Sequence, residues 1–317
     1  MIRKRLQYLA NRTFITVLLA AIYTSLANAP ALAESRPQSE SLTVATAANF
    51  APTLKKLAAQ YEADAEGAVS IKIVSGSSGK LATQIRQGAP FDLFFSADEK
   101  APAMLIDSGH ADADSVFTYA IGRLVLATRH PAIEQPLQEL LRGRFKRLAI
   151  ANPELAPYGA AAMDTLRSLG VEQRSADKLV SGENIAQTFQ FVASGNAELG
   201  LIALSQLQQF KAEKGRKLRH WLVPESLHQP IRQNAILVSS SDNPRSGNAA
   251  RLFLRFVGSQ PAKHIISANG YRTVEKIPFD AGTLPPVPGD SENGLTSQYS
   301  PDLGRSDTQL ASRSSTR

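Results

Sequence analysis

The sequence predicts an α/β protein in which short strands alternate with amphipathic helices. Between Ser41 and Phe279, each apolar run typical of a strand is followed by a segment with helical apolar spacing, and glycine closes most of these segments. The chain has 317 residues, 43% hydrophobic and 20% charged, enough for one large domain or two medium ones. Alternation of this length favours parallel strands joined by crossover helices.

The first half of this region contains three predicted strands and three predicted helices. Residues 42–45, 69–74 and 91–95 are predicted strands. Phe50, Leu54, Leu57, Ala58 and Tyr61 share one face of the first predicted helix. The other two helices contain residues 81–85, closed by Gly88, and residues 99–108.

The second half continues the pattern. The apolar run at 119–128 predicts one longer strand, and further strands are expected at 148–151, 199–204 and 235–238. Asn184 is the expected N-cap of a helix that Gly195 closes. The remaining predicted helices cover residues 159–169, 247–257 and 261–268.

Both ends of the chain are expected to lie outside the fold. Residues 1–33 contain a basic start, an apolar run too short to span a bilayer and Ala-x-Ala spacings, the pattern of a secretory signal peptide. Cleavage is expected after Ala33, with export to the periplasm and no lipid anchor, since the chain has no cysteine. Residues 280–317 are rich in Pro, Gly, Ser and Asp, which predicts a disordered tail.

Composition excludes several kinds of function. The absence of cysteine excludes disulfides, thiolate metal sites and a thiol nucleophile, and five isolated histidines disfavour a His-rich metal site. Four of the seven net positive charges lie in residues 1–33, and the remainder shows no basic run with interleaved aromatics. Neither nucleic-acid binding nor catalysis is therefore expected.

Four short polar turns lead into predicted helices, and the first three of them follow predicted strands. They are Ala47–Asn49, Ser75–Gly79, the loop ending at Tyr158, and Ser181–Asn184. They carry amide and hydroxyl donors with no obligatory Lys or Arg, and helix N-termini in such positions bind anions. A pocket of donors alone favours a fully deprotonated tetrahedral dianion over monohydrogen phosphate, whose proton needs an acceptor. Each turn taken singly is equally typical of an ordinary loop or cap.

These turns and their surroundings resemble the periplasmic molybdate-binding proteins of molybdenum ABC importers. The resemblance covers residues 42 to about 275 and rests on these segments: TVATAANFAPTL (43–54), VSGSSGKLATQI (74–85), GAPFDLFFSADEK (88–100), YAIGRLVLAT (119–128), IANPELAPYG (150–159), ENIAQTF (183–189) and ELGLIAL (198–204). It implies a type II periplasmic-binding-protein fold, in which two α/β lobes joined by two hinge crossings enclose a ligand cleft. Lobe one would comprise residues 34–119 and 232–279, and lobe two residues 120–231.

The resemblance also implies the binding residues. The oxyanion contacts fall on Asn49, Ser78, Tyr158 and Ile185, flanked by Ala48 and Asn184. Asn49 and Ser78 would offer side-chain and backbone donors, and Ile185 its backbone N–H. These residues would hold the metal through the oxyanion oxygens, not by direct coordination. One branch of the family has a ligand tyrosine where this chain has Ala203, and Tyr158 is expected to supply the missing hydroxyl.

The implied function is that of a non-catalytic, monomeric receptor without a cofactor. It would bind molybdate, and tungstate with it, and deliver the anion to an inner-membrane ABC permease with its cytoplasmic ATPase. Three alternatives stay open: a binding protein for another tetrahedral oxyanion such as sulfate, an enzyme on the same fold, and a sensor that docks a signalling partner.

Overall fold

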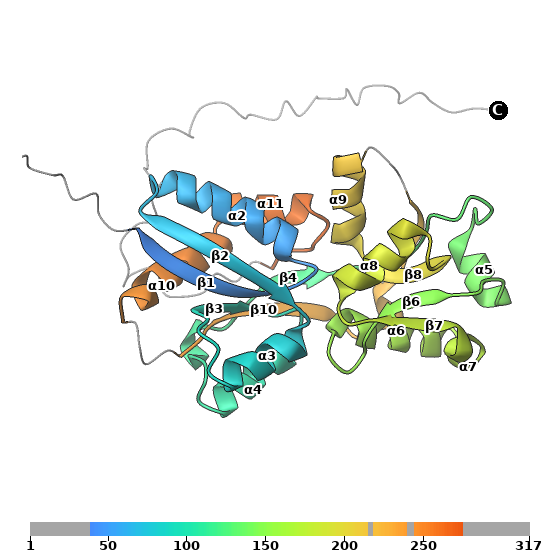
Figure 1. Ribbon diagram of the computed structural model, residues 1–317, viewed down its shortest axis with the longest axis horizontal. Helices are drawn as coiled ribbons and strands as arrows, with labels where there is room; N and C mark the ends of the chain where they lie inside the picture. The colour runs from blue at the N-terminus through green and yellow to red at the C-terminus, as the bar shows by residue number, and fades with distance from the viewer. Residues whose placement is uncertain (1–38, 215–217, 240–243, 275–317) are drawn as a thin grey trace, which may run out of the picture. The chain divides into compact units, whose positions relative to one another are not determined.

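The computed structural model describes residues 39–214, 218–239 and 244–274, and these form two five-stranded sheets flanked by helices (Figure 1). The predicted signal peptide and C-terminal tail lie outside the described residues. Within the described residues, no helix combines the length and apolar character needed to cross a bilayer.

The first sheet has the strand order β2-β1-β3-β10-β4. β1 is parallel to β2 and β3, whereas β10 is antiparallel to β3 and β4. The sheet is therefore mixed, not purely parallel as the alternation of elements suggested. Its strands are β1 (Glu40–Ala47), β2 (Val69–Gly76), β3 (Leu93–Phe95), β4 (Phe117–Gly122) and β10 (Ile231–Leu237).

Helices cover both faces of this sheet. One face packs against α2 (Ala51–Asp64), α10 (Pro244–Gly258) and α11 (Gln260–Ala268) around a core that includes Phe50, Phe95 and Phe253. The other face packs against α3 (Ser78–Arg86) and α4 (Lys100–Asp107). Strands covered on both sides bury both sets of alternating side chains, which is why β3 appears as a continuous apolar run.

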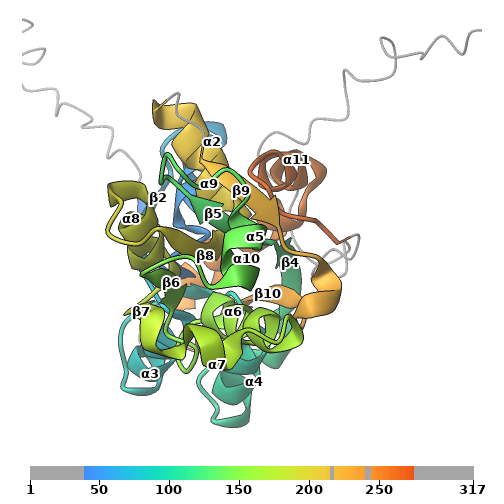
Figure 2. The ribbon, with the colours of Figure 1, turned by 90° about the vertical axis from the view of Figure 1, so that its right-hand side faces the viewer.

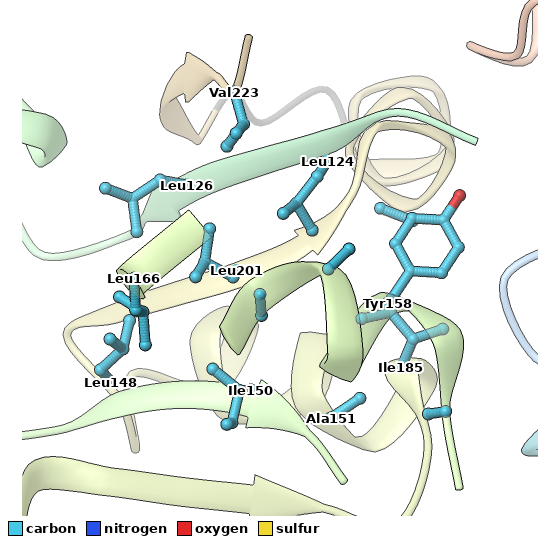
Figure 3. Packing of buried hydrophobic residues seen from close by; sticks show 14 of the residues in the cluster. Leu124, Leu126, Leu148, Ile150, Ala151, Tyr158, Leu166, Ile185, Leu201 and Val223 are labelled. Carbon is cyan, nitrogen blue, oxygen red and sulfur yellow. The ribbon is translucent and has the colours of Figure 1, made fainter. Parts of the chain in front are cut away.

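The second sheet has the order β7-β6-β8-β5-β9 and is also mixed. Alternate residues of β5 face opposite sides: Leu124 and Leu126 join the core beneath α6, and Val125 and Ala127 join the core beneath α8. Figure 2 views the molecule from the side of this sheet and its helices. Figure 3 shows the core beneath α6 from close by. The elements are β5 (Leu124–Thr128), β6 (Leu148–Ala151), β7 (Leu179–Gly182), β8 (Leu199–Ala203), β9 (Arg219–Leu222), α5 (Pro136–Arg142), α6 (Pro157–Ser168), α7 (Glu172–Ser175), α8 (Ile185–Ser194) and α9 (Leu204–Lys214), and 3-10 turns lie at Ala113–Ser115, Ala176–Lys178 and Glu225–Leu227.

The chain crosses between the sheets twice, after β4 and before β10. The prediction of one strand over 119–128 is wrong, because the run divides at Arg123 into β4 of the first sheet and β5 of the second. The break cannot be seen in the sequence, because both strands are almost wholly buried and their apolar pattern is therefore continuous. A Cβ at Gly122 would lie 2.6 Å from the Gln233 amide nitrogen, so the crossing leaves no room for a side chain there.

The fold class is confirmed: two α/β lobes, each built on its own mixed sheet. Residues 120–122 pair in the first sheet, although the predicted limits place them in lobe two. The lobe limits themselves stay a prediction. The sequence missed α5, α7, α9, β7 and β9, of which β7 and β9 are short edge strands with much exposed surface.

Candidate functional site

A cavity that is partly open to solvent lies between the two lobes, where the turns after several strands meet; its empty space, open solvent included, is about 200 Å³. All six residues predicted for the site line it. No charged side chain is among the lining residues, which are Ala47, Ala48, Asn49, Gly76, Ser77, Ser78, Ala97, Ala156, Pro157, Tyr158, Asn184 and Ile185. The cavity is therefore a neutral site built from both lobes.

Six main-chain N–H groups of the residues that line this cavity have no acceptor among the described residues. They lie at or just before the starts of α2, α3, α6 and α8 and belong to Asn49, Ser77, Ser78, Tyr158, Asn184 and Ile185. The first N–H groups of a helix have no intrahelical partner and carry the positive end of its dipole. Four such ends at one uncharged cavity form an anion-binding arrangement.

Local capping explains why these particular N–H groups are free. The Asn184 side chain accepts from the N–H groups of Ala186 and Gln187, at 2.9 and 3.1 Å, and the Asn184 carbonyl accepts from that of Thr188. In this turn, the N–H groups of Ile185 and of Asn184 itself are left without an acceptor among the described residues. This confirms Asn184 as the cap of α8.

The start of α6 leaves one N–H free by a different route. Pro157 has no N–H, and the N–H groups of Gly159 and Ala160 both bond to the Ala156 carbonyl. Tyr158 therefore keeps the one unpaired N–H of that turn. Two different local sequences thus produce the same free donor.

The two serines at the start of α3 differ in their hydrogen bonds. Ser78 Oγ accepts from the Ala97 N–H at 2.9 Å, which leaves its own proton available. Ser77 Oγ is enclosed and has no hydrogen-bond partner. Both side chains are buried, so neither hydroxyl is satisfied by bulk water.

A buried network of amide and phenol groups lies behind the cavity. Gln233 Oε1 accepts from Asn49 Nδ2 at 3.0 Å and from the Tyr119 hydroxyl at 2.9 Å. Gln233 Nε2 donates to the Tyr158 hydroxyl at 3.2 Å. Asn49 Nδ2 also donates to the Tyr271 hydroxyl at 3.2 Å. Both Nδ2 protons of Asn49 are therefore used inside the protein, and its free donor is the backbone N–H.

The phenols of this network stay protonated at physiological pH. Burial raises the pKa of Tyr158 and Tyr119 well above the usual tyrosine value, with nearby Tyr271 adding to both shifts. Burial also raises the pKa of Tyr271 to about 12. The network therefore brings no negative charge to the cavity.

Direct contacts join the lobes at the rim of the cavity. The Gly79 N–H donates to the Leu155 carbonyl at 3.0 Å, and Lys80 pairs with Glu183 at 3.1 Å. Both side chains of this ion pair are more than half exposed, so it contributes little energy. Because Lys80 is paired and lies at the rim, the cavity itself stays uncharged.

Some residues of the site were not singled out from the sequence. Ser77 lies in the Ser-Gly turn already recognised, but nothing in the turn distinguishes its hydroxyl from that of Ser78. Gln233 lies between Arg232 and Asn234 in β10, so nothing in the local sequence marks it as part of the site. Ala203 is buried in β8 and lies outside the cavity lining. No cluster of three or more His, Asp or Glu side chains that could hold a metal occurs in the described residues.

Comparison with known proteins identifies the family. The family model for bacterial extracellular solute-binding proteins matches residues 42–272. The chain belongs to this family. The match confirms the resemblance seen in the motifs, and it spans both sheets and the whole cavity.

Three relatives are particularly similar. The molybdate-binding protein ModA of Azotobacter vinelandii is 42% identical over 236 residues, covering 74% of this chain and 90% of the relative. That of Rhodobacter capsulatus is 38% identical, covering 72% and 87%. The solved structure of the Azotobacter vinelandii periplasmic molybdate-binding protein superposes with a TM-score of 0.67 at 37% identity, covering 74% of this chain and 99% of that structure.

The affinity of the cavity for a fully deprotonated anion is expected to be constant between about pH 7 and about pH 9. No charged side chain lines the cavity, and a raised tyrosine pKa keeps the phenol neutral below it, so no donor is lost in this interval. Isothermal titration at several pH values checks this. An affinity that falls steadily across the interval would show that a titrating group contacts the anion.

Proposed function

We propose that this protein is a receptor that binds molybdate, and tungstate with it, in the interlobe cavity. The observation that carries the proposal is the convergence of six unpaired main-chain N–H groups, from four helix starts, on an uncharged site between the lobes. A tetrahedral dianion accepts hydrogen bonds at every oxygen and donates none, so it matches such a site. Two relatives named as molybdate-binding proteins, at 42% and 38% identity, favour molybdate over sulfate.

The six residues predicted from the sequence form the proposed binding set. Asn49, Ser78, Tyr158 and Ile185 would donate to the oxyanion through their backbone N–H groups, and Ser78 also through its hydroxyl. Ala48 and Asn184 would shape the cavity and fix the turns. Protein atoms would contact the oxygens of the anion, not the metal at its centre.

The receptor would deliver its ligand to an inner-membrane ABC permease with a cytoplasmic ATPase. The match to the family of extracellular solute-binding proteins supports this proposal. The signal-peptide pattern of residues 1–33 supports a periplasmic location after their removal. The proposal includes a monomeric, non-catalytic protein without a cofactor, which binds no nucleic acid. Residues 280–317 have no part in it.

Isothermal titration with molybdate, tungstate, sulfate and phosphate tests the proposal. Molybdate and tungstate are expected to bind tightly, with no heat from phosphate and weak or no heat from sulfate. At about 1,000 times its dissociation constant, a bound anion also adds about 4 kcal/mol to the free energy of unfolding. Heat from sulfate with none from molybdate would instead identify a sulfate receptor.

Replacing Ser78 by alanine is expected to weaken molybdate binding by about 1–3 kcal/mol, because a donor to a buried anion is removed. It also leaves the Ala97 N–H without its acceptor, so the free protein loses stability as well. Thr83→Ala is the matched control, since Thr83 is an exposed hydroxyl residue on the same helix that bonds only to the Gly79 carbonyl. Equal affinities of the Ser78 and Thr83 variants would remove the Ser78 hydroxyl from the binding set and leave only its backbone N–H there.

Replacing Tyr158 by phenylalanine separates its two groups. The hydroxyl lies at the lobe crossing and accepts from Gln233, whereas the N–H lies at the start of α6. The variant is expected to lose about 1–3 kcal/mol of stability, because the Gln233 amide is left unpaired, and to change molybdate affinity less than about threefold. Thermal unfolding and titration measure the two effects. A tenfold loss of affinity would assign the hydroxyl to the ligand, as the replacement for the tyrosine absent at Ala203.

A further inference from the structure

Ser77 is the N-cap of α3, but its hydroxyl does not act as a cap. An N-cap serine usually accepts a hydrogen bond from the second or third N–H of its helix. The side chain of Ser77 makes no such bond, although its extended backbone is that of an N-cap residue. Its oxygen is enclosed by protein and has no partner, and the residue is only 4% exposed.

A buried hydroxyl without a partner is unfavourable, so its position needs a reason. Four side-chain atoms are in this condition among the described residues: Asn49 Oδ1, Ser77 Oγ, Ser175 Oγ and His228 Nε2. Two of their residues, Asn49 and Ser77, line the interlobe cavity. Of these two atoms, only the Ser77 hydroxyl can donate a proton, and it is not bonded to the Asn49 oxygen.

We infer that the Ser77 hydroxyl is a further donor to the oxyanion bound in this cavity. The inference rests on the proposed function and adds to it a contact that the motifs did not assign. The N-cap residue Ser77 directly precedes Ser78, and both residues line the same cavity. The hydroxyl has no acceptor in the part of the chain that the structure describes, so its proton is free for an oxygen of the ligand.

This role gives the Ser77 variant a signature that a structural role would not produce. Removing the hydroxyl takes away an unpaired buried group, so the free protein should be as stable as wild type or more stable. The same change removes a donor from a buried charged ligand, so affinity should fall. Stability and affinity therefore change in opposite directions, unlike in Ser78→Ala, where both fall.

The test compares Ser77→Ala with Ser175→Ala in the full chain. Ser175 is a matched control because its hydroxyl is also buried and unpaired but lies outside the cavity lining. Molybdate titration should show a loss of about 10- to 100-fold for Ser77→Ala and none for Ser175→Ala. The melting temperature of the free protein should not fall in either variant.

A second variant keeps the inference falsifiable. Ser77→Gly also removes the hydroxyl, and glycine is well tolerated at N-caps, so it should show the same loss of affinity. If wild type binds molybdate and both Ser77 variants bind within about threefold of it, Ser77 is not a donor and the proposed function stands. A fall in both melting temperature and affinity in both variants would show a structural role and overturn the inference. If wild type binds none of the four oxyanions, the proposed function fails, and the inference with it.

Discussion

The side-chain amide of Gln233 is the interaction on which the geometry of the site depends. It lies on β10, the second strand at the lobe crossing, next to the register shift between Gln233 and Asn234. Its oxygen accepts from Asn49, ahead of α2, and its nitrogen donates to Tyr158, at the start of α6. An amide can do both without a charge, which neither a carboxylate nor an aliphatic side chain can. One uncharged group thus ties a helix start of each lobe to the hinge.

Neutrality is the second constraint, and it explains why the site is built from backbone. A lysine or arginine in an enclosed cavity would need desolvation or a counter-charge, whereas a helix N-terminus supplies partial positive charge already fixed in place. The arrangement works only if the helices leave those N–H groups unpaired. Asn184 and Ala156 therefore satisfy the neighbouring N–H groups and spare those of Ile185 and Tyr158. Capping here selects which donor remains free.

The sequence predicts features that depend on neighbours in the chain. Asn184 before an apolar helix, Gly195 after it and the Ser-Gly turn at 75–79 are local, and the structure has the first two as cap and helix end. It does not predict features that depend on distant residues. The division of 119–128 into two sheets is set by β10 and β8, and the role of Gln233 by residues 75 and 184 positions away. The Ser77 hydroxyl is distinguished from that of Ser78 only by the Ala97 N–H, which the turn itself does not reveal.

Choice between tetrahedral dianions follows from how the donors are held. Every donor at the cavity can donate to molybdate and to sulfate alike, because both anions are fully deprotonated and differ chiefly in size. Hydrogen-bonding chemistry alone therefore cannot separate them. Asn49 and Ser78 belong to one lobe, Tyr158 and Ile185 to the other. The distance across the ligand is therefore the distance between the lobes. That distance is fixed at the back by the Gln233 amide and at the rim by the bond from Gly79 to the Leu155 carbonyl. A preference for the larger anion would therefore depend on contacts between the lobes that do not touch the ligand.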